Sequence, residues 1–438
     1  MSRAAARPRS WRHAVWHGTP PAPPTPVRRW RPSPRPTWKQ GPGIPSRTLA
    51  SWSRRIADGP GLEGVDVLVV DEAAMTDDRQ MAALLTEAER TGTKVVAIGD
   101  PQQLQAIGPG GGFAEIHRLV GGVALTENRR QAHEGEQAAL RVWRTGARRE
   151  ALHMMAAAER IHAVESAEEA RTAVLAAWDA ARGRWSDPHD QLAELVVLAA
   201  RNDDVTALNT GAQALRRTAG ELGQEHTYAL PGGDRLTLAT GDIVRVRVND
   251  YRSRRDQGPD LLNGYRAVVA ALDSQHRIRI TWRTPDSTHQ DAWLTPDQVA
   301  GGALSLGYAM TIAASQGLTA TTALTYGYGA DAYALYPGIT RAREANHLWL
   351  PLAALEDEET RTLLGDARSE TERLERAVSA YAKLLRQDRP DSMVSDHLRP
   401  APEPAAAPAE RKDQQVSERA QSDLPAQRPQ SAGALYRS

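Results

Sequence analysis

Two clusters of polar residues follow apolar, strand-like runs of this sequence. Asp71 and Glu72 follow a run rich in Val and Leu, and Gly99, Asp100 and Gln103 follow a second apolar run. A carboxylate at a strand end can hold Mg²⁺ through water, because Mg²⁺ keeps much of its hydration shell. A second carboxylate can orient an attacking water, and a glutamine can contact a terminal phosphate. These residue types therefore predict nucleotide hydrolysis.

A helical pattern separates the two runs. Met81, Leu84, Leu85 and Ala88 recur at helical spacing, and Thr76 is a candidate N-cap. The order strand, helix, strand predicts a parallel sheet, and ligands bind at the carboxyl edge of such a sheet. Two acids after a strand are more often a solvated turn, so the second polar cluster gives the pattern its weight.

Composition limits the classes of protein that fit. The chain has 438 residues, with 54 basic and 54 acidic side chains, so any nucleic-acid site must be a local patch. Cysteine is absent, which excludes disulfides and a thiol nucleophile and fits a cytoplasmic protein. No apolar run approaches the length of a membrane span.

The runs VVDEAAM and GDPQQLQAIGPGG resemble motifs II and III of superfamily 1 DNA helicases. The RecD-like branch is the most similar, including the helicase half of MobF-type (TrwC-type) conjugative relaxases. Residues 125–131, 306–319 and 334–347 resemble the opening of the second motor domain, motif V and motif VI, in the family's order. The resemblance implies an α/β fold with two RecA-like P-loop NTPase lobes, ATP and Mg²⁺ as cofactors, and single-stranded DNA as partner.

The resemblance assigns catalytic roles by position. Asp71 would organise Mg²⁺ through water, and Glu72 would activate the attacking water. Gln103 would sense the γ-phosphate. Arg130 would act as an arginine finger, with Arg129 as the less favoured alternative. The catalytic residues implied in this way are Asp71, Glu72, Gln103, Arg130 and Arg341.

Other residues are implied to contact the nucleotide. Gln316 and Gly317 would let the backbone approach the phosphates closely. Tyr336 could stack on the base, with burial as the alternative. The full set is Gly99, Asp100, Gln316, Gly317 and Tyr336.

A third group is implied to contact DNA. The hydroxyls of Thr311 and Ser315 would reach phosphate oxygens. Trp282 and Trp293 could stack on bases, although a place in the barrel core is the favoured role for each. Ala313 and Ala314 occupy positions where a histidine and a basic residue are common in the family. The full set is Thr48, Arg201, Asn202, Thr311, Ser315, Trp282 and Trp293.

The first lobe is expected to be incomplete. The family's phosphate-binding loop, GxxxxGK[ST], is not found, and no Gly-Lys pair exists in the sequence. We therefore expect weak or no ATP hydrolysis from this chain alone. Residues 1–40 hold eight Arg, nine Pro, four Trp and no acid. They fit a disordered segment, a basic arm or an aberrant start that replaces lost helicase sequence, and we favour the last.

Short runs in which Val and Ile alternate with Arg predict a small β-barrel. It resembles the SH3-like insert that RecD-type helicases carry inside the second lobe. The predicted parts are an irregular start at 1–40, lobe 1 at 41–124, lobe 2 at 125–227 and 304–352, the insert at 228–303, a helix at 353–387 and a disordered tail at 388–438. The alternative to an ATP-dependent DNA helicase is a non-catalytic remnant that binds single-stranded DNA or a partner. Other conjugation proteins are possible partners. A metal nuclease is poorly supported, because carboxylates and histidines are not clustered.

Overall fold

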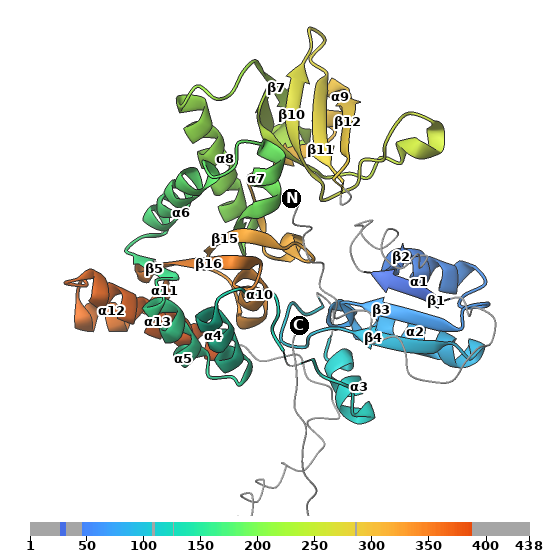
Figure 1. Cartoon of the computed structure of the whole chain (residues 1–438), viewed down its shortest axis with the longest axis horizontal. Helices are drawn as coiled ribbons and strands as arrows, with labels where there is room; N and C mark the ends of the chain where they lie inside the picture. The colour runs from blue at the N-terminus through green and yellow to red at the C-terminus, as the bar shows by residue number, and fades with distance from the viewer. Residues whose placement is uncertain (1–26, 32–45, 107–109, 126, 285–286, 388–438) are drawn as a thin grey trace, which may run out of the picture. The chain divides into compact units, whose positions relative to one another are not determined.

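The computed structural model describes residues 27–31, 46–106, 110–125, 127–284 and 287–387 (Figure 1). Within these ranges the strands form four sheets, of which two are parallel and two are antiparallel. The parallel sheets are consistent with two RecA-like lobes, called lobe 1 and lobe 2 below.

Lobe 1 is built on a parallel sheet of order β2-β1-β3-β4. Its strands are β1 (Val27–Arg31), β2 (Ser46–Thr48), β3 (Val67–Asp71) and β4 (Lys94–Ile98). Its helices are α1 (Leu49–Asp58), the 3-10 turn η2 (Ala73–Met75), α2 (Asp78–Thr91) and α3 (Gly112–Val120).

The strand β1 corrects the expectation for residues 1–40, whose composition predicts no regular structure. Val27 pairs with Val67 and Trp30 with Val70, while Arg31 pairs with Thr48 on the other side. The partner strands lie well beyond residue 40 in the sequence, so local composition carried no sign of this pairing.

The core of lobe 1 follows the predicted helical spacing. Met81, Leu84 and Ala88 of α2 are buried, whereas Leu85 is 37% exposed. The cap differs from the prediction, because Asp77 accepts the hydrogen bond from the backbone nitrogen of Gln80.

Lobe 2 is built on a second parallel sheet, of order β14-β6-β15-β16-β5. The strands are β5 (Ile161–Val164), β6 (Leu195–Ala199), β14 (Ala309–Thr311), β15 (Ala320–Tyr326) and β16 (Ala342–Pro351). The other elements before and after the insert are α4 (Glu134–Arg144), α5 (Arg148–Ala157), α6 (Ala167–Arg182), α7 (Pro188–Glu194), α8 (Asn202–Thr218), η5 (Ala313–Ser315) and α10 (Ala332–Gly338).

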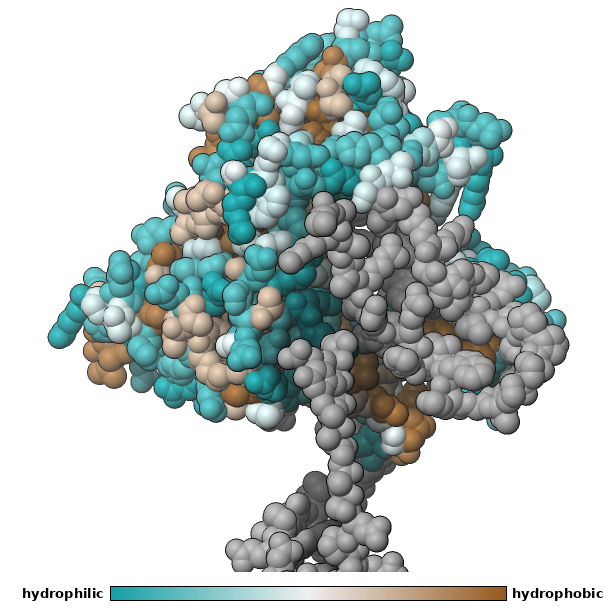
Figure 2. Space-filling view, in the orientation of Figure 1, coloured by the Kyte–Doolittle hydropathy of each residue, from teal (hydrophilic) through white to brown (hydrophobic). Residues whose placement is uncertain are grey.

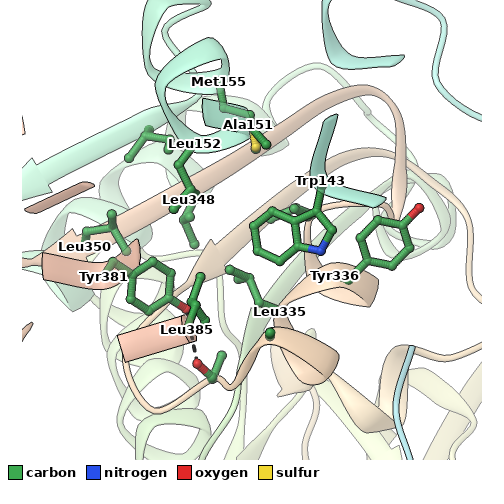
Figure 3. Close-up of a cluster of buried hydrophobic side chains, with 14 of the residues drawn as sticks. Trp143, Ala151, Leu152, Met155, Leu335, Tyr336, Leu348, Leu350, Tyr381 and Leu385 are labelled. Atoms are coloured by element: carbon green, nitrogen blue, oxygen red, sulfur yellow. Dashed lines mark hydrogen bonds between the residues drawn. The ribbon is translucent and has the colours of Figure 1, made fainter. Parts of the chain in front are cut away.

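Both faces of this sheet are covered. Along β6, Val196 and Leu198 belong to one buried cluster, while Leu195 and Val197 belong to another. Successive side chains of a strand point to opposite faces, so an uninterrupted apolar strand requires helices on both sides. One cluster contains residues of α4, α5, α10 and α13 (Figure 3), and the other contains residues of α6 and α8.

The insert between α8 and β14 is a small antiparallel domain with its own core. One sheet has the order β12-β11-β10-β9-β13, and β7 and β8 form a separate two-stranded sheet. Its elements are β7 (Glu225–Ala229), η3 (Pro231–Gly233), β8 (Arg235–Ala239), β9 (Ile243–Val246), η4 (Arg252–Arg255), β10 (Arg266–Leu272), β11 (Ile278–Arg283), β12 (His289–Leu294), α9 (Pro296–Ala300) and β13 (Leu304–Leu306). Its SH3-like character stays a prediction.

The last helices of the described chain pack on lobe 2. They are α11 (Leu352–Leu355), α12 (Glu358–Leu364) and α13 (Glu370–Gln387). Tyr381 and Leu385 of α13 are buried in the lobe 2 core (Figure 3). The Tyr381 hydroxyl donates to the carbonyl oxygen of Gly327 at 2.7 Å. The apolar stripe of α13 therefore packs against the core of lobe 2. The tail predicted at 388–438 lies outside the described residues.

Candidate nucleotide and DNA site

The two polar clusters of lobe 1 meet at one edge of its sheet. Strands β3 and β4 are parallel neighbours, and Asp71 pairs with Ile98 in their register. Glu72 and Gly99, the residues that follow these two strands, therefore lie side by side at the edge of the sheet. This is the arrangement expected from the strand-helix-strand pattern.

Glu72 has an unusual backbone. Its φ and ψ are 54° and 41°, in the left-handed region that non-glycine residues rarely adopt. Gly99 packs under the same turn, because a Cβ there would lie 3.0 Å from the nitrogen of Ala74 and 3.1 Å from that of Ala73. Strain of this kind gathers at functional sites and costs about 1–3 kcal/mol. The close packing of Gly99 thus constrains the backbone conformation of the turn that carries Glu72.

Asp100 organises the turn after β4. Its Oδ1 accepts from the backbone nitrogen of Gln102 at 3.1 Å, and its Oδ2 accepts from Nε2 of Gln103 at 3.0 Å. The Gln103 amide is therefore oriented by its own loop. Asp100 also forms an ion pair of 2.7 Å with Arg144, from lobe 2.

Arg130 is the arginine that the structure brings towards the acids of lobe 1. Its Nη1 donates to the carbonyl oxygen of Thr340 at 3.1 Å. Burial of the guanidinium lowers the pKa of Arg130, and the negative charge of Glu72 acts in the opposite direction. Arg129 instead pairs with Glu127 at 2.6 Å, and both side chains are well exposed. Of the two candidates, Arg130 is the one whose pKa responds to the charge of Glu72.

Arg341 lies inside lobe 2, where it is only 2% exposed. Its Nε donates to the carbonyl oxygen of Pro337 at 2.7 Å, and its Nη1 donates to that of Ser315 at 3.4 Å. The side chain therefore joins the motif VI helix to the motif V turn. Two of its donors are used within the lobe, which differs from the γ-phosphate contact expected by position.

Of the two roles expected for Tyr336, base stacking and burial, the structure shows burial. It is 6% exposed, and its ring is stacked with Trp143 at a centroid distance of 6.3 Å (Figure 3). The guanidinium of Arg144 lies 5.7 Å from the ring centroid and donates to the hydroxyl at 3.3 Å. Burial raises the pKa of Tyr336. The ring is thus part of the core and has no open face for a base.

The motif V turn offers one free donor. The Ser315 hydroxyl is buried and donates to the carbonyl oxygen of Ile312 at 2.7 Å, so its expected contact with a DNA phosphate is not available in this conformation. Nε2 of Gln316 is buried without a hydrogen-bond partner among the described residues. Gly317 follows with φ of +72°, which glycine adopts without strain.

Three of the predicted DNA contacts gather at the carboxyl edge of the lobe 2 sheet. Thr311 pairs with Ala199 between β14 and β6, and Arg201 and Asn202 follow β6 at the start of α8. The Arg201 side chain is 52% exposed. Thr48 belongs to lobe 1, where its hydroxyl oxygen caps α1 by accepting from the backbone nitrogen of Ser51 at 3.2 Å.

The two tryptophans of the insert have different environments. Trp282 is 2% exposed and shares the buried face of β11 with Ile278 and Ile280, so it cannot stack on DNA. Trp293 is 38% exposed, with the guanidinium groups of Arg277 and Arg279 at 5.4 and 5.9 Å from its ring. Alternation along the strands would have separated them, because Trp293 lies between the buried Ala292 and Leu294.

Sequence reasoning missed Arg144, which no motif marks. It also missed a cavity of about 290 Å³ that residues of both lobes line. The lining residues include Gln102, Gln105 and Phe113 from lobe 1 and Trp143, Arg148 and Tyr333 from lobe 2. No predicted catalytic residue lines it.

The residues present fit part of a nucleotide site. Asp71 suits Mg²⁺ held jointly with phosphates, because Mg²⁺ commonly takes one or two carboxylates and keeps its water. A self-sufficient metal site does not fit, since the described residues contain no group of three or more His, Cys, Asp or Glu that could hold an ion. The unpartnered Gln316 donor fits an incoming acceptor.

Hydrophobic residues are also exposed at the end of lobe 1. Leu119 and Val120 of α3 are 64% and 71% exposed, and Val123 and Leu125 follow at 91% and 78%. Figure 2 shows hydrophobic surface at the position that α3 occupies in Figure 1.

No helix in the described ranges is both long and apolar enough to cross a membrane.

Known proteins match parts of this chain. Residues 37–166 match a family model described as an AAA domain. The chain is 31% identical over 311 residues to the conjugal transfer protein TraA of Rhizobium radiobacter and 29% identical over 309 residues to that of Agrobacterium fabrum. Each match covers 70% of this chain and 26% of the relative, so the chain spans about a quarter of the relatives' length.

Solved structures of Pif1 helicase resemble the chain more distantly. The Bacteroides Pif1 structure with single-stranded DNA is 16% identical, with a TM-score of 0.46, and covers 80% of this chain and 89% of its own. The same helicase with ADP-AlF3 and single-stranded DNA is 15% identical, with a TM-score of 0.45, and covers 78% and 89%.

The parallel sheets define an α/β protein, part of which matches an AAA domain.

Proposed function

We propose that this chain is the motor part of a conjugative-transfer helicase that binds single-stranded DNA and whose nucleotide turnover is impaired. One observation carries the proposal: the parallel pairing of β3 and β4 sets Glu72 beside the Gly99–Asp100 turn at one edge of the lobe 1 sheet. Arg130 of lobe 2 lies near enough for the charge of Glu72 to act on its pKa. An acid that activates water and a guanidinium that stabilises phosphoryl charge are the two sides of a nucleotide-hydrolysing site.

The chain's own residues would divide the work. Asp71 would hold Mg²⁺ through water, and Mg²⁺ would neutralise phosphate charge. Glu72 would accept a proton from the attacking water, and Gln103, oriented by Asp100, would contact the terminal phosphate. Impairment follows because the sequence contains no GxxxxGK[ST] loop to cradle the phosphates.

A phosphate-release assay with ATP, Mg²⁺ and single-stranded DNA tests the turnover. We expect release near background, which Glu72→Gln does not lower further. Rapid release that Glu72→Gln abolishes would show a working motor and contradict the impairment.

DNA binding is tested by fluorescence anisotropy with a labelled single strand. Arg201→Ala should weaken binding, because Arg201 is an exposed cation at the carboxyl edge of the lobe 2 sheet. Arg217→Ala, which alters an arginine of the same helix paired with Glu225, is the matched control. Absence of binding by the parent chain would remove the DNA part of the proposal.

The second candidate is a non-catalytic DNA-binding protein. It is favoured by the burial of Arg341 and Tyr336, which ties both side chains to contacts within lobe 2. The two candidates differ in whether nucleotide changes the affinity for single-stranded DNA. If ATP with Mg²⁺ changes the affinity for single-stranded DNA, the motor part is supported. If the affinity is indifferent to ATP, the non-catalytic candidate is supported.

A further inference from the structure

Arg144 connects the two lobes through a two-point ion pair. It is the last residue of α4, and its Nη1 and Nη2 lie 2.7 and 3.4 Å from Oδ2 and Oδ1 of Asp100. Paired contacts of a guanidinium with a carboxylate fix orientation as well as distance. Because Asp100 lies in the turn that also orients Gln103, this contact reaches the nucleotide edge of lobe 1.

The same turn also holds the main chain of Arg144. Nε2 of Gln102 donates to the Arg144 carbonyl oxygen at 3.0 Å, which supplies a partner to one of the open carbonyls at the end of α4. A lone surface ion pair contributes little to stability. Here, the side chain and the carbonyl of Arg144 are both bound by residues of the Gly99–Gln103 turn. The contact therefore fixes the position of Arg144 relative to that turn.

A third contact extends the connection into lobe 2. Nη1 of Arg144 donates to the Tyr336 hydroxyl at 3.3 Å, and the guanidinium lies over the ring. Burial opposes the charge of Arg144, but the hydrogen bonds with Asp100 and Tyr336 raise its pKa, so it stays cationic. Tyr336 belongs to α10, the helix whose Pro337 carbonyl accepts from Arg341.

We propose that Arg144 is a positioning residue that couples the lobe 1 turn at Asp100 to the lobe 2 helix α10. Through it, a displacement of one lobe is transmitted to the motif V and motif VI elements of the other. This deepens the proposed function, since relative motion of the lobes is what a nucleotide or a DNA strand would drive. Arg144 acts through Asp100 and Tyr336 and contacts no nucleotide itself.

Spin-label distance measurement on the full chain tests the coupling. The sequence has no cysteine, so Ala82→Cys on α2 and Ala214→Cys on α8, both exposed, give one label on each lobe. Without nucleotide or DNA, we expect a narrow distance distribution in the parent and a broader, longer one after Arg144→Ala. Arg141→Ala, an exposed arginine of the same helix, should match the parent.

Charge reversal supplies a rescue. The pair Asp100→Arg with Arg144→Asp should recover most of the narrow distribution, whereas Asp100→Arg alone should not. If Arg144→Ala unfolds the chain, Arg144→Lys replaces it, because lysine keeps the charge but loses the two-point geometry. A distribution unchanged by a folded Arg144 variant would overturn the coupling. Because these measurements need neither ATP nor DNA, a failure of the proposed function would appear separately, in the anisotropy and phosphate-release assays.

Discussion

Asp242 and Tyr308, 66 residues apart, share a buried hydrogen bond of 2.5 Å from the tyrosine hydroxyl to the carboxylate. Asp242 is fully buried just before β9 of the insert, and Tyr308 lies where the chain returns to lobe 2. Gln213 of α8 donates to the same carboxylate at 2.7 Å. The insert is therefore anchored to lobe 2 by polar contacts at its base.

Tyr308→Phe should lower stability. The variant removes a donor from a buried carboxylate, and hydrogen bonds to charged groups contribute about 1.5–3 kcal/mol. Chemical denaturation followed by circular dichroism measures the change. Tyr251→Phe is the control, because Tyr251 is a 40% exposed tyrosine of the same insert. Equal denaturation midpoints for the two variants would contradict the anchoring role.

Arg341→Ala should destabilise the chain even without nucleotide. The carbonyl oxygens of Pro337 and Ser315 each lose the donor that the guanidinium supplies, and hydrogen bonds to charged groups contribute about 1.5–3 kcal/mol. Differential scanning calorimetry should show a lower melting temperature. Arg129→Ala should leave it nearly unchanged, because an exposed ion pair contributes about 0–1 kcal/mol. A melting temperature unaffected by Arg341→Ala would indicate that this arginine serves only a ligand.

Stability should fall as the pH drops from about 6.5 towards 4. Burial, with the neighbouring His162, lowers the pKa of His347 from 6.5 to about 4. The folded state thus favours the neutral ring, so its contribution is complete above pH 6.5 and is lost as the pH falls through about 4. Because the His347 ring is partly exposed to solvent, the loss of stability should be smaller than the about 3 kcal/mol that the full pKa difference would give.

The free energy of unfolding measured at several pH values checks this. His347→Gln should flatten the acid side of the curve, even if it lowers stability at neutral pH. His133→Gln, at an exposed position, should keep the parent's slope. An unchanged slope in His347→Gln would assign the pH dependence to other groups.

Trp282 and Trp293 should respond oppositely in stability and DNA binding. Nε1 of Trp282 is buried without a partner among the described residues, so Trp282→Phe removes an unsatisfied donor and should cost less than about 1 kcal/mol. Trp282→Ala should cost about 3–5 kcal/mol. Trp293→Ala should leave stability nearly unchanged and weaken single-stranded DNA binding by about 1–3 kcal/mol if a base stacks on it. If a folded Trp282→Phe variant binds DNA more weakly while Trp293→Ala binds DNA as tightly as the parent, this assignment would be reversed.

Local pattern explains much of what the sequence predicted correctly. The helix around Met81 and Leu84 and the apolar strands before Asp71 and Gly99 follow from periodicity within a few residues. Parallel strands align their carboxyl ends, so the placing of Glu72 beside Gly99 followed from the same pattern. The residue types at that edge of the sheet are therefore a consequence of local sequence.

The sequence by itself determined most of the elements, their order and the chemical groups at the strand ends, because these depend on neighbours along the chain. Only the tertiary structure decided which side chains those groups meet. It paired Val27–Arg31 with strands beyond residue 40, buried Arg341 and Tyr336, and brought Arg144 to Asp100. The physical reason is that burial and ion pairing are set by what packs from distant segments, and such contacts leave no periodic signal in the sequence.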